Sequence, residues 1–246
     1  MRVAKTGGPS DGTDDAALLE LFRAIAARDH VEVARLLNSA PGLAARPLRA
    51  GASRQDADAY FLVAIRHYVY SGDTALHIAA AAYQRELAES LVASGAGVRA
   101  RNRRGAEPLH YAADSSPDAE HWDPDAQRDV IAYLIAAGAD PNALDKSGVA
   151  PLHRAVRTRC SAAVSALIEN GADPRLMNKH GSTPLHLAVQ NTGRSGSGSE
   201  TAKDEQGRVI AVLLQHGARP TDVDANGKTV ADAASSDWIL RLLDST

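Results

Sequence analysis

Four histidines recur in this chain and are the first candidates for chemistry. Histidine can ligate a metal or transfer a proton near neutral pH. Each of the four follows a leucine, and they are His77, His110, His153 and His186. None lies in a His-Glu-x-x-His motif, and no Cys-x-x-Cys pair accompanies them. The sequence therefore predicts no metal site, no cofactor and no catalytic residue, and we expect a protein that is not an enzyme.

One cysteine and one glycine-serine run are the remaining candidates for chemistry. Cys160 is a potential nucleophile at the beginning of an expected helix, but no general base is identifiable for it. Residues 193–199 read Gly-Arg-Ser-Gly-Ser-Gly-Ser and lack the Gly-Lys-Ser/Thr ending that a phosphate-binding loop requires. We interpret this run as a flexible connector.

Composition restricts the class of protein further. Of 246 residues, 44% are hydrophobic and 23% are charged, a balance that excludes disorder over the whole chain. The net charge of −3 is too small to indicate binding to nucleic acid or to a membrane surface. The longest apolar run, residues 130–139, is too short to span a membrane. With a single cysteine and no signal-peptide pattern, we expect a cytoplasmic protein, and frequent alanine and arginine suggest a bacterial source.

The histidines belong to one phrase that occurs four times, at residues 74–79, 107–112, 150–155 and 183–188. Its leucines lie 33, 43 and 33 residues apart. An apolar helical pattern follows each phrase and ends at a Gly-Ala pair, which begins at Gly95, Gly138, Gly171 and Gly217. A glycine turn then opens the next unit, at Gly105, Gly148, Gly181 and Gly227.

In period, phrase and order the chain resembles the ankyrin-repeat family. The resemblance implies an all-α solenoid of stacked helix-turn-helix modules with β-turn or hairpin tips, in about six repeats including degenerate end caps. It also implies that the four histidines are structural and bond both locally and to the next module. Glu107 and Ala150 stand where threonine is usual, so we expect the threonine hydroxyl bond to be missing in those two modules.

We expect residues 1–13 to be a disordered tail and residues 14–246 to form a single domain. Within that domain we place repeat 1 at 14–45, an aromatic insert at 46–69, further repeats at 70–102, 103–145, 146–178 and 179–224, and a C-terminal cap at 225–246.

Three segments exceed the plain repeat. The insert and its border contain Tyr60, Phe61, His67, Tyr68 and Tyr70, which form either a hydrophobic cover for the end of the stack or an aromatic binding surface. Extra residues within 115–127 and 191–207 fall between paired helices, so both should project from the same edge. Trp122, in the first of these loops, either folds back onto a helix or anchors a contact.

The family resemblance also implies a function. Ankyrin repeats suggest a monomeric, non-catalytic protein-protein interaction module, an adaptor, scaffold or inhibitor that binds its partner through the concave face. Family binding residues carry over to the tips and inner helices, and with Trp122 they are Tyr70, Arg103, Arg104, Lys146, Lys179, His180, Asp114, Arg157, Gln190 and Asn191. Five of these are positive against Asp114 alone, so we expect a partner with an acidic surface. The alternative is a small-ligand-binding or enzyme-accessory role for the insert and the Trp122 loop.

Overall fold

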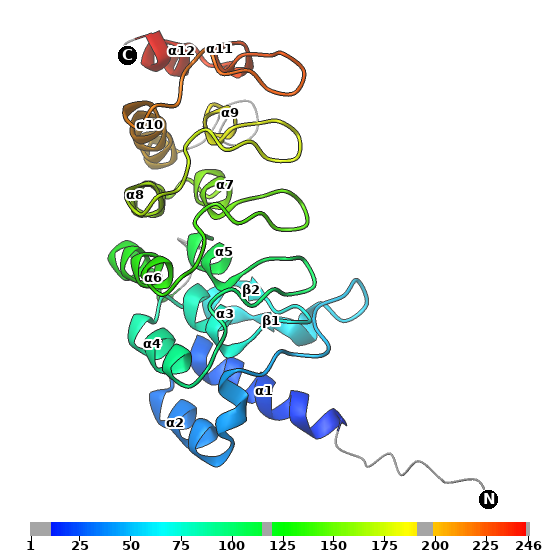
Figure 1. Cartoon of the computed structure of the whole chain (residues 1–246). Coiled ribbons are helices and arrows are strands. Elements are labelled where there is room, and N and C mark those ends of the chain that lie inside the picture. The colour runs from blue at the N-terminus through cyan, green and yellow to red at the C-terminus, as the bar shows by residue number, and fades with distance from the viewer. Residues whose placement is uncertain (1–10, 115–119, 191–198, 245–246) are drawn as a thin grey trace, which may run out of the picture.

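A computed structural model describes residues 11–114, 120–190 and 199–244 as a stack of helix pairs (Figure 1). The pairs are α1 (Asp11–Ala26) with α2 (His30–Ser39), α3 (Ala75–Ala81) with α4 (Arg85–Ala93), α5 (Pro108–Ala113) with α6 (Pro124–Ala136), α7 (Pro151–Arg157) with α8 (Ser161–Glu169), α9 (Pro184–Ala188) with α10 (Glu200–Gln215), and α11 (Val230–Ala233) with α12 (Asp237–Asp244). The predicted all-α solenoid is confirmed.

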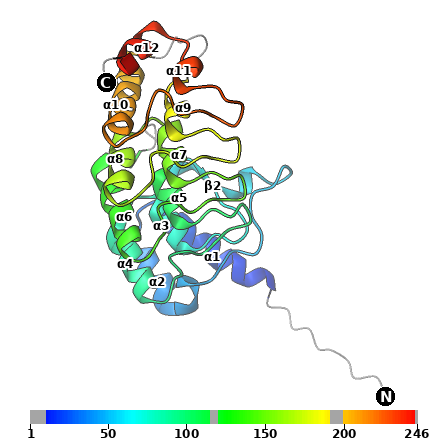
Figure 2. The same ribbon diagram turned by 45° about the horizontal axis from the view of Figure 1, so that its top comes forward.

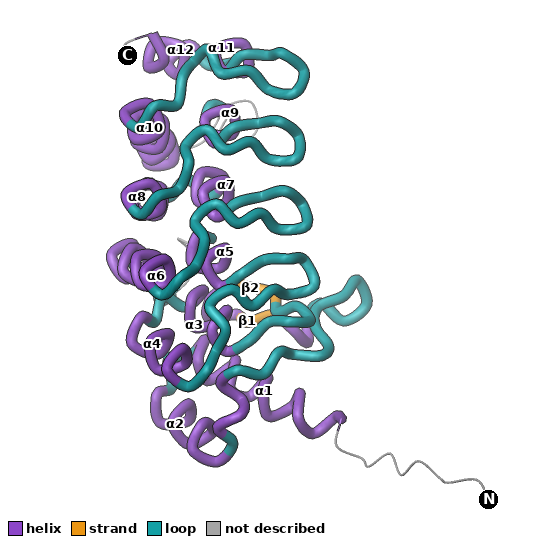
Figure 3. The backbone as a smooth tube through the Cα atoms, in the orientation of Figure 1, coloured by secondary structure: helices purple, strands orange, loops and turns teal. Residues whose placement is uncertain are grey.

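The helices form two rows, and the loops project from one side of the stack. Helices α3, α5, α7, α9 and α11 form the inner row, while α4, α6, α8, α10 and α12 form the outer row. Long loops between successive pairs extend sideways as parallel fingers (Figures 2 and 3). We call the surface formed by the inner helices and the adjoining loop tips the concave face.

The repeated phrase explains where the inner helices begin. Proline occupies the first turn of α5, α7 and α9, where its missing N–H has no helical partner to lose. The Nδ1 atom of His77 accepts from the Thr74 backbone N–H at 3.2 Å and lies 3.0 Å from the Thr74 hydroxyl. Its Nε2 atom lies 3.2 Å from the carbonyl of Ala106 in the next repeat. The histidine therefore links two modules.

The other three histidines repeat the local bond. His186 accepts from the backbone and hydroxyl of Thr183, and its Nε2 atom lies 3.2 Å from the Lys228 carbonyl. His110 and His153 accept only from a backbone N–H, at 3.2 Å in both cases, because Glu107 and Ala150 provide no hydroxyl. The Glu107 carboxylate instead accepts from Arg101 Nε at 3.0 Å. The predicted local bond is therefore confirmed in all four modules. The predicted bond to the next module is present for His77, His110 and His186, whereas the buried Nε2 atom of His153 makes no hydrogen bond with the described residues.

Each loop tip is built around one asparagine or aspartate. Its side-chain oxygen accepts two backbone N–H groups across the turn, at 2.7 to 3.2 Å, and the four residues are Asn102, Asp145, Asn178 and Asp224. Gly105 follows with a φ of 76°, and a Cβ there would lie 2.9 Å from the backbone nitrogen of Lys146. Successive tips are therefore stacked in direct contact.

The insert is part of the core. It contains two-residue strands β1 (Phe61–Leu62) and β2 (His67–Tyr68), paired antiparallel, and short 3₁₀ helices at Asp58–Tyr60 and Val63–Ile65. The buried side chains of Leu48, Leu62, Ile65 and Val69 fix it to the stack. The His67 ring lies 4.4 Å from that of Tyr111 on α5, so the hairpin covers part of the concave face. The insert thus forms a hydrophobic cover, but on the concave face and not at the end of the stack, where α1 and α2 lie (Figure 1). The Tyr68 side chain remains 39% exposed.

Helix boundaries differ from the sequence expectation in three places. Helix α1 begins at Asp11, inside the segment 1–13 for which we predict disorder; residues 1–10 lie outside the described residues. Helices α6 and α10 begin at Pro124 and Glu200, so part of each expected insertion extends an outer helix. Residues 115–119 and 191–198 lie outside the described residues.

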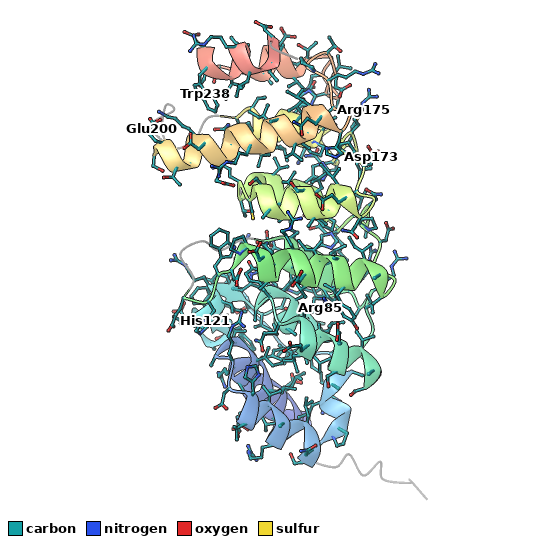
Figure 4. The ribbon with its side chains drawn as sticks, turned by 90° about the vertical axis from the view of Figure 1, so that its left-hand side faces the viewer. Arg85, His121, Asp173, Arg175, Glu200 and Trp238 are labelled. Atoms are coloured by element: carbon teal, nitrogen blue, oxygen red, sulfur yellow. The ribbon has the colours of Figure 1, made fainter. Side chains whose placement is uncertain are left out.

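Two buried glutamines account for these longer outer helices. Gln127 Nε2 donates to the Ala112 carbonyl at 2.7 Å, and Gln206 Nε2 donates to the Ala188 carbonyl at 2.6 Å. Each amide thus satisfies the end of its partner inner helix, where the last carbonyls have no helical donor. His121 and Glu200 lie shortly after residues 115–119 and 191–198 in the chain, and both are on the same edge of the stack (Figure 4).

Candidate functional site

Most of the predicted tip residues are exposed on the concave face. Arg103, Arg104, Lys146, Lys179 and His180 all lie at the ends of loops and are exposed to solvent. Backbone bonds join neighbouring tips, because the Lys146 N–H donates to the Arg104 carbonyl at 2.9 Å. The tips therefore present their cations along one row.

Two of these arginines contact the ring of Tyr70. The guanidinium carbons of Arg103 and Arg104 lie 5.3 and 4.8 Å from the centre of the Tyr70 ring, within cation-π range. Arg104 Nη1 also donates to the Tyr70 hydroxyl at 2.8 Å, and Arg103 donates to the carbonyl of Ala52 in the insert. The insert and the next tip thus form one cluster, which the sequence did not predict.

Asp114 is not an isolated acidic group. Its carboxylate pairs with Arg154 at 2.7 Å, and Arg154 also pairs with Asp145 at 3.1 Å. The Arg154 side chain is only 12% exposed, so this charge is largely shielded from solvent. Our sequence reasoning missed both partners and therefore counted the charges of the concave face incompletely. A signal existed, because Arg154 occupies the phrase position that holds Ile78 and Leu187 in other repeats.

A buried polar network supports the same region. The Tyr111 hydroxyl donates to Asp73 at 2.7 Å, and Asn102 Nδ2 donates to the same carboxylate at 2.8 Å. Burial and the adjacent Asp73 carboxylate raise the pKa of Tyr111 well above its ordinary value. The phenol is therefore a fixed donor and not a candidate base.

A polar cleft of about 240 Å³ lies between the insert hairpin and the inner helices. It brings together four of the predicted residues, Tyr70, Arg104, Asp114 and Arg157. A smaller adjoining pocket of about 90 Å³ joins Arg157 to Gln190. The lysines at 146 and 179 and His180 lie at the tips and line neither space, and Asn191 lies outside the described residues.

Trp122 lies apart from this cluster. Its indole Nε1 donates to Gln127 Oε1 at 3.2 Å at the beginning of outer helix α6, and its ring packs on the hydrophobic core. Of the two alternatives for Trp122, the fold-back onto a helix is the one observed.

Cys160 and His110, both considered for chemistry in the sequence, are buried. Cys160 is buried, and its thiol donates to Gln127 Oε1 at 3.4 Å. Burial, and secondly the nearby Arg154 guanidinium, lowers the pKa of His110 to about 4, so this ring is neutral at physiological pH. In the part of the chain that the structure describes, no cluster of three or more histidine, cysteine, aspartate or glutamate side chains could hold a metal ion. No helix in that part is long and apolar enough to cross a membrane.

Comparison with known families identifies the repeat. A family model described as ankyrin repeats, in three copies, matches residues 124–203. The single ankyrin-repeat model matches residues 71–103 and 180–227. A search of curated proteins found no match. The matched ranges contain three of the four histidine phrases in full and together cover more than half of the chain.

Proposed function

Because the chain belongs to the ankyrin-repeat family, we propose that it is a non-catalytic interaction module that binds a protein partner through its concave face. Ankyrin repeats are generally protein-interaction modules. We further propose a monomeric, cytoplasmic adaptor, scaffold or inhibitor, since the single cysteine provides no disulfide.

The observation that carries this proposal is the row of exposed cations beside the inner helices. Lys146 and Lys179 stand on successive tips, and Arg157 lies below them on α7. None of the three has an ion-pair partner among the described residues, so their charges remain available to a ligand. A row of like charges on one face steers a partner of opposite charge and selects an acidic surface.

The insert limits the part of the concave face that is open to a partner. Its hairpin lies against Tyr111 on α5, so the chain itself covers this part of the inner row. The open part of the concave face therefore extends from the insert hairpin toward α9. This arrangement supports binding beside the hairpin and along the repeats that follow it.

A small-ligand or enzyme-accessory role has weaker support. It requires the insert and Trp122 to share a site, but Trp122 bonds to Gln127 on α6 whereas the insert contacts Tyr111 and the tip arginines. Trp122 and the aromatic residues of the insert thus do not share a site.

The proposal is tested by capturing the partner from the source cell and measuring its binding to purified protein. We expect the double variant Lys146→Glu and Lys179→Glu to bind about tenfold more weakly or worse, mainly through slower association at low salt. The matched control is the double variant Arg85→Glu and Arg128→Glu on outer helices α4 and α6, which changes the net charge by the same amount. Arg85 lies on the outer-helix face, opposite the concave face (Figure 4). Equal losses in the two variants would contradict binding through the concave face.

A further inference from the structure

The cleft beside the insert has an excess of positive charge. It is lined by residues of the insert hairpin, of the adjoining loop tips and of inner helices α5 and α7. Four of these side chains are arginines and two are aspartates. The distribution of these charges within the cleft decides what it can bind.

Both aspartates already pair with an arginine of the same cleft. Arg154 pairs with one oxygen of each carboxylate, at 2.7 and 3.1 Å. The other oxygen of Asp145 accepts the backbone N–H groups of Ser147 and Val149. Internal partners also lower the pKa of Asp145, which keeps it ionised. Arg154 and the two aspartates thus form one ion-pair group in the wall of the cleft.

Arg104 and Arg157 remain without a carboxylate partner among the described residues, although both line the same cleft. Tyr70 holds Arg104 through one Nη1 bond of 2.8 Å and through its ring. A guanidinium has five N–H donors, so Nη2 and Nε are left for a ligand. Because Tyr70 already orders this side chain, a ligand need not immobilise it again.

The size of the cleft indicates what kind of group enters. Its volume of about 240 Å³ lies below the roughly 300–1,000 Å³ that sites for small molecules and cofactors usually have. It is large enough for one side chain of a larger ligand. Two aspartates at its wall also disfavour a dianion relative to a singly charged group.

We propose that this cleft receives the carboxylate of a glutamate or aspartate side chain from an acidic protein segment, with Arg104 and Arg157 as its ligands. This inference rests on the proposed function and identifies the partner chemistry. The exposed ring of Tyr68 provides an apolar wall for the methylene groups of the entering side chain. The insert hairpin thereby contributes directly to recognition.

The test uses a fluorescein-labelled peptide of about ten glutamates, measured by fluorescence anisotropy at low ionic strength. A glutamine peptide of equal length is the neutral control. We expect Arg104→Gln and Arg157→Gln each to weaken binding about tenfold, as expected for lost charged hydrogen bonds. Arg85→Gln removes the same charge on the outer-helix face, outside the cleft, and should change affinity about twofold or less (Figure 4). Tyr70→Phe retains the ring but removes the bond that orders Arg104, so its loss should be intermediate.

Three outcomes would overturn the proposal. The first is that the glutamate peptide does not bind the wild-type protein. This result would leave the proposed function intact, because that function is tested with the partner captured from the cell. The second is an equal loss for Arg85→Gln and the cleft variants, which would indicate a nonspecific effect of net charge. The third is tighter binding of a phosphoserine peptide with the same loss pattern, which would assign the cleft to phosphate. Thermal unfolding of each variant checks that the fold is intact, as we expect for Arg157→Gln because this side chain is exposed.

Discussion

The Tyr111 hydroxyl lies 2.7 Å from the Asp73 carboxylate, and both side chains are fully buried. The same carboxylate accepts from Asn102 Nδ2 at 2.8 Å and from the Tyr70 backbone N–H at 2.6 Å. A buried ionised carboxylate is tolerated only with such donors. The bonds join the end of the insert, a loop tip and inner helix α5, so Asp73 fixes the insert against the repeats.

Replacing Tyr111 with phenylalanine removes one donor and keeps the ring. We expect a loss of about 1–3 kcal/mol in the free energy of unfolding, because a buried carboxylate loses a charged hydrogen bond. Urea denaturation measures this loss. Tyr133→Phe on outer helix α6 is the matched control, because its hydroxyl makes no hydrogen bond with the described residues, and it should change stability by less than about 0.5 kcal/mol. Similar small effects for both variants would contradict the role assigned to Asp73.

The repeated elements could be predicted from the sequence because their bonds are local. His77 and Thr74 are three residues apart, and the same spacing recurs at His186 and Thr183. The insert could not be predicted in this way. Its position depends on pairs such as Leu48 with Asp73, and no periodic pattern indicates which distant backbone it meets.

The candidate site was predicted less completely than the fold. The tip cations follow from the repeat register, but the Arg154 pair with Asp114 spans 40 residues and two repeats. In the sequence, Arg154 is one more charged residue on a short helix. Only the packing of α5 beside α7 makes it the partner of two carboxylates, which changes the charge of the cleft.

Leu152 tests the core of a central repeat. It is 2% exposed on α7, so Leu152→Ala should lower the free energy of unfolding by about 2–5 kcal/mol through lost burial and a residual cavity. Leu144→Ala is the matched control, since that leucine is 39% exposed at a tip and should cost less than about 1 kcal/mol. Chemical denaturation distinguishes the two, and a cost below about 1 kcal/mol for Leu152 would place this leucine outside the core.

The next prediction concerns the buried amide of Gln206 on α10. Its amide donates to the carbonyls of Ala188 and Gln190 at 2.6 and 2.7 Å, so Gln206→Ala leaves two acceptors without this donor. We expect a loss of about 1–3 kcal/mol. Gln190→Ala changes an exposed side chain instead and should be nearly neutral. A neutral Gln206→Ala variant would contradict the structural role of this amide.

The last prediction concerns pH and follows from the buried histidines. His110 has a pKa of about 4 in the folded protein, because burial and the Arg154 guanidinium oppose its protonation. In the unfolded chain the ring returns to a pKa of about 6.5. Between these values the unfolded state binds the extra proton, so the free energy of unfolding rises with pH. The stabilisation is therefore complete above about pH 6.5 and is lost as the pH falls toward 4.

For His110 alone we expect a loss of about 2 kcal/mol between pH 7 and 5, and burial lowers the pKa of His77 and His153 as well, so the total should be larger. Urea denaturation at a series of pH values measures the profile. Because carboxylates titrate mainly below pH 5, this window reports on the histidines. His110→Gln keeps a polar side chain but removes the titration, so its profile should be shallower than that of the wild type by about 1 kcal/mol per pH unit. Parallel profiles would show that His110 does not titrate with the expected shift.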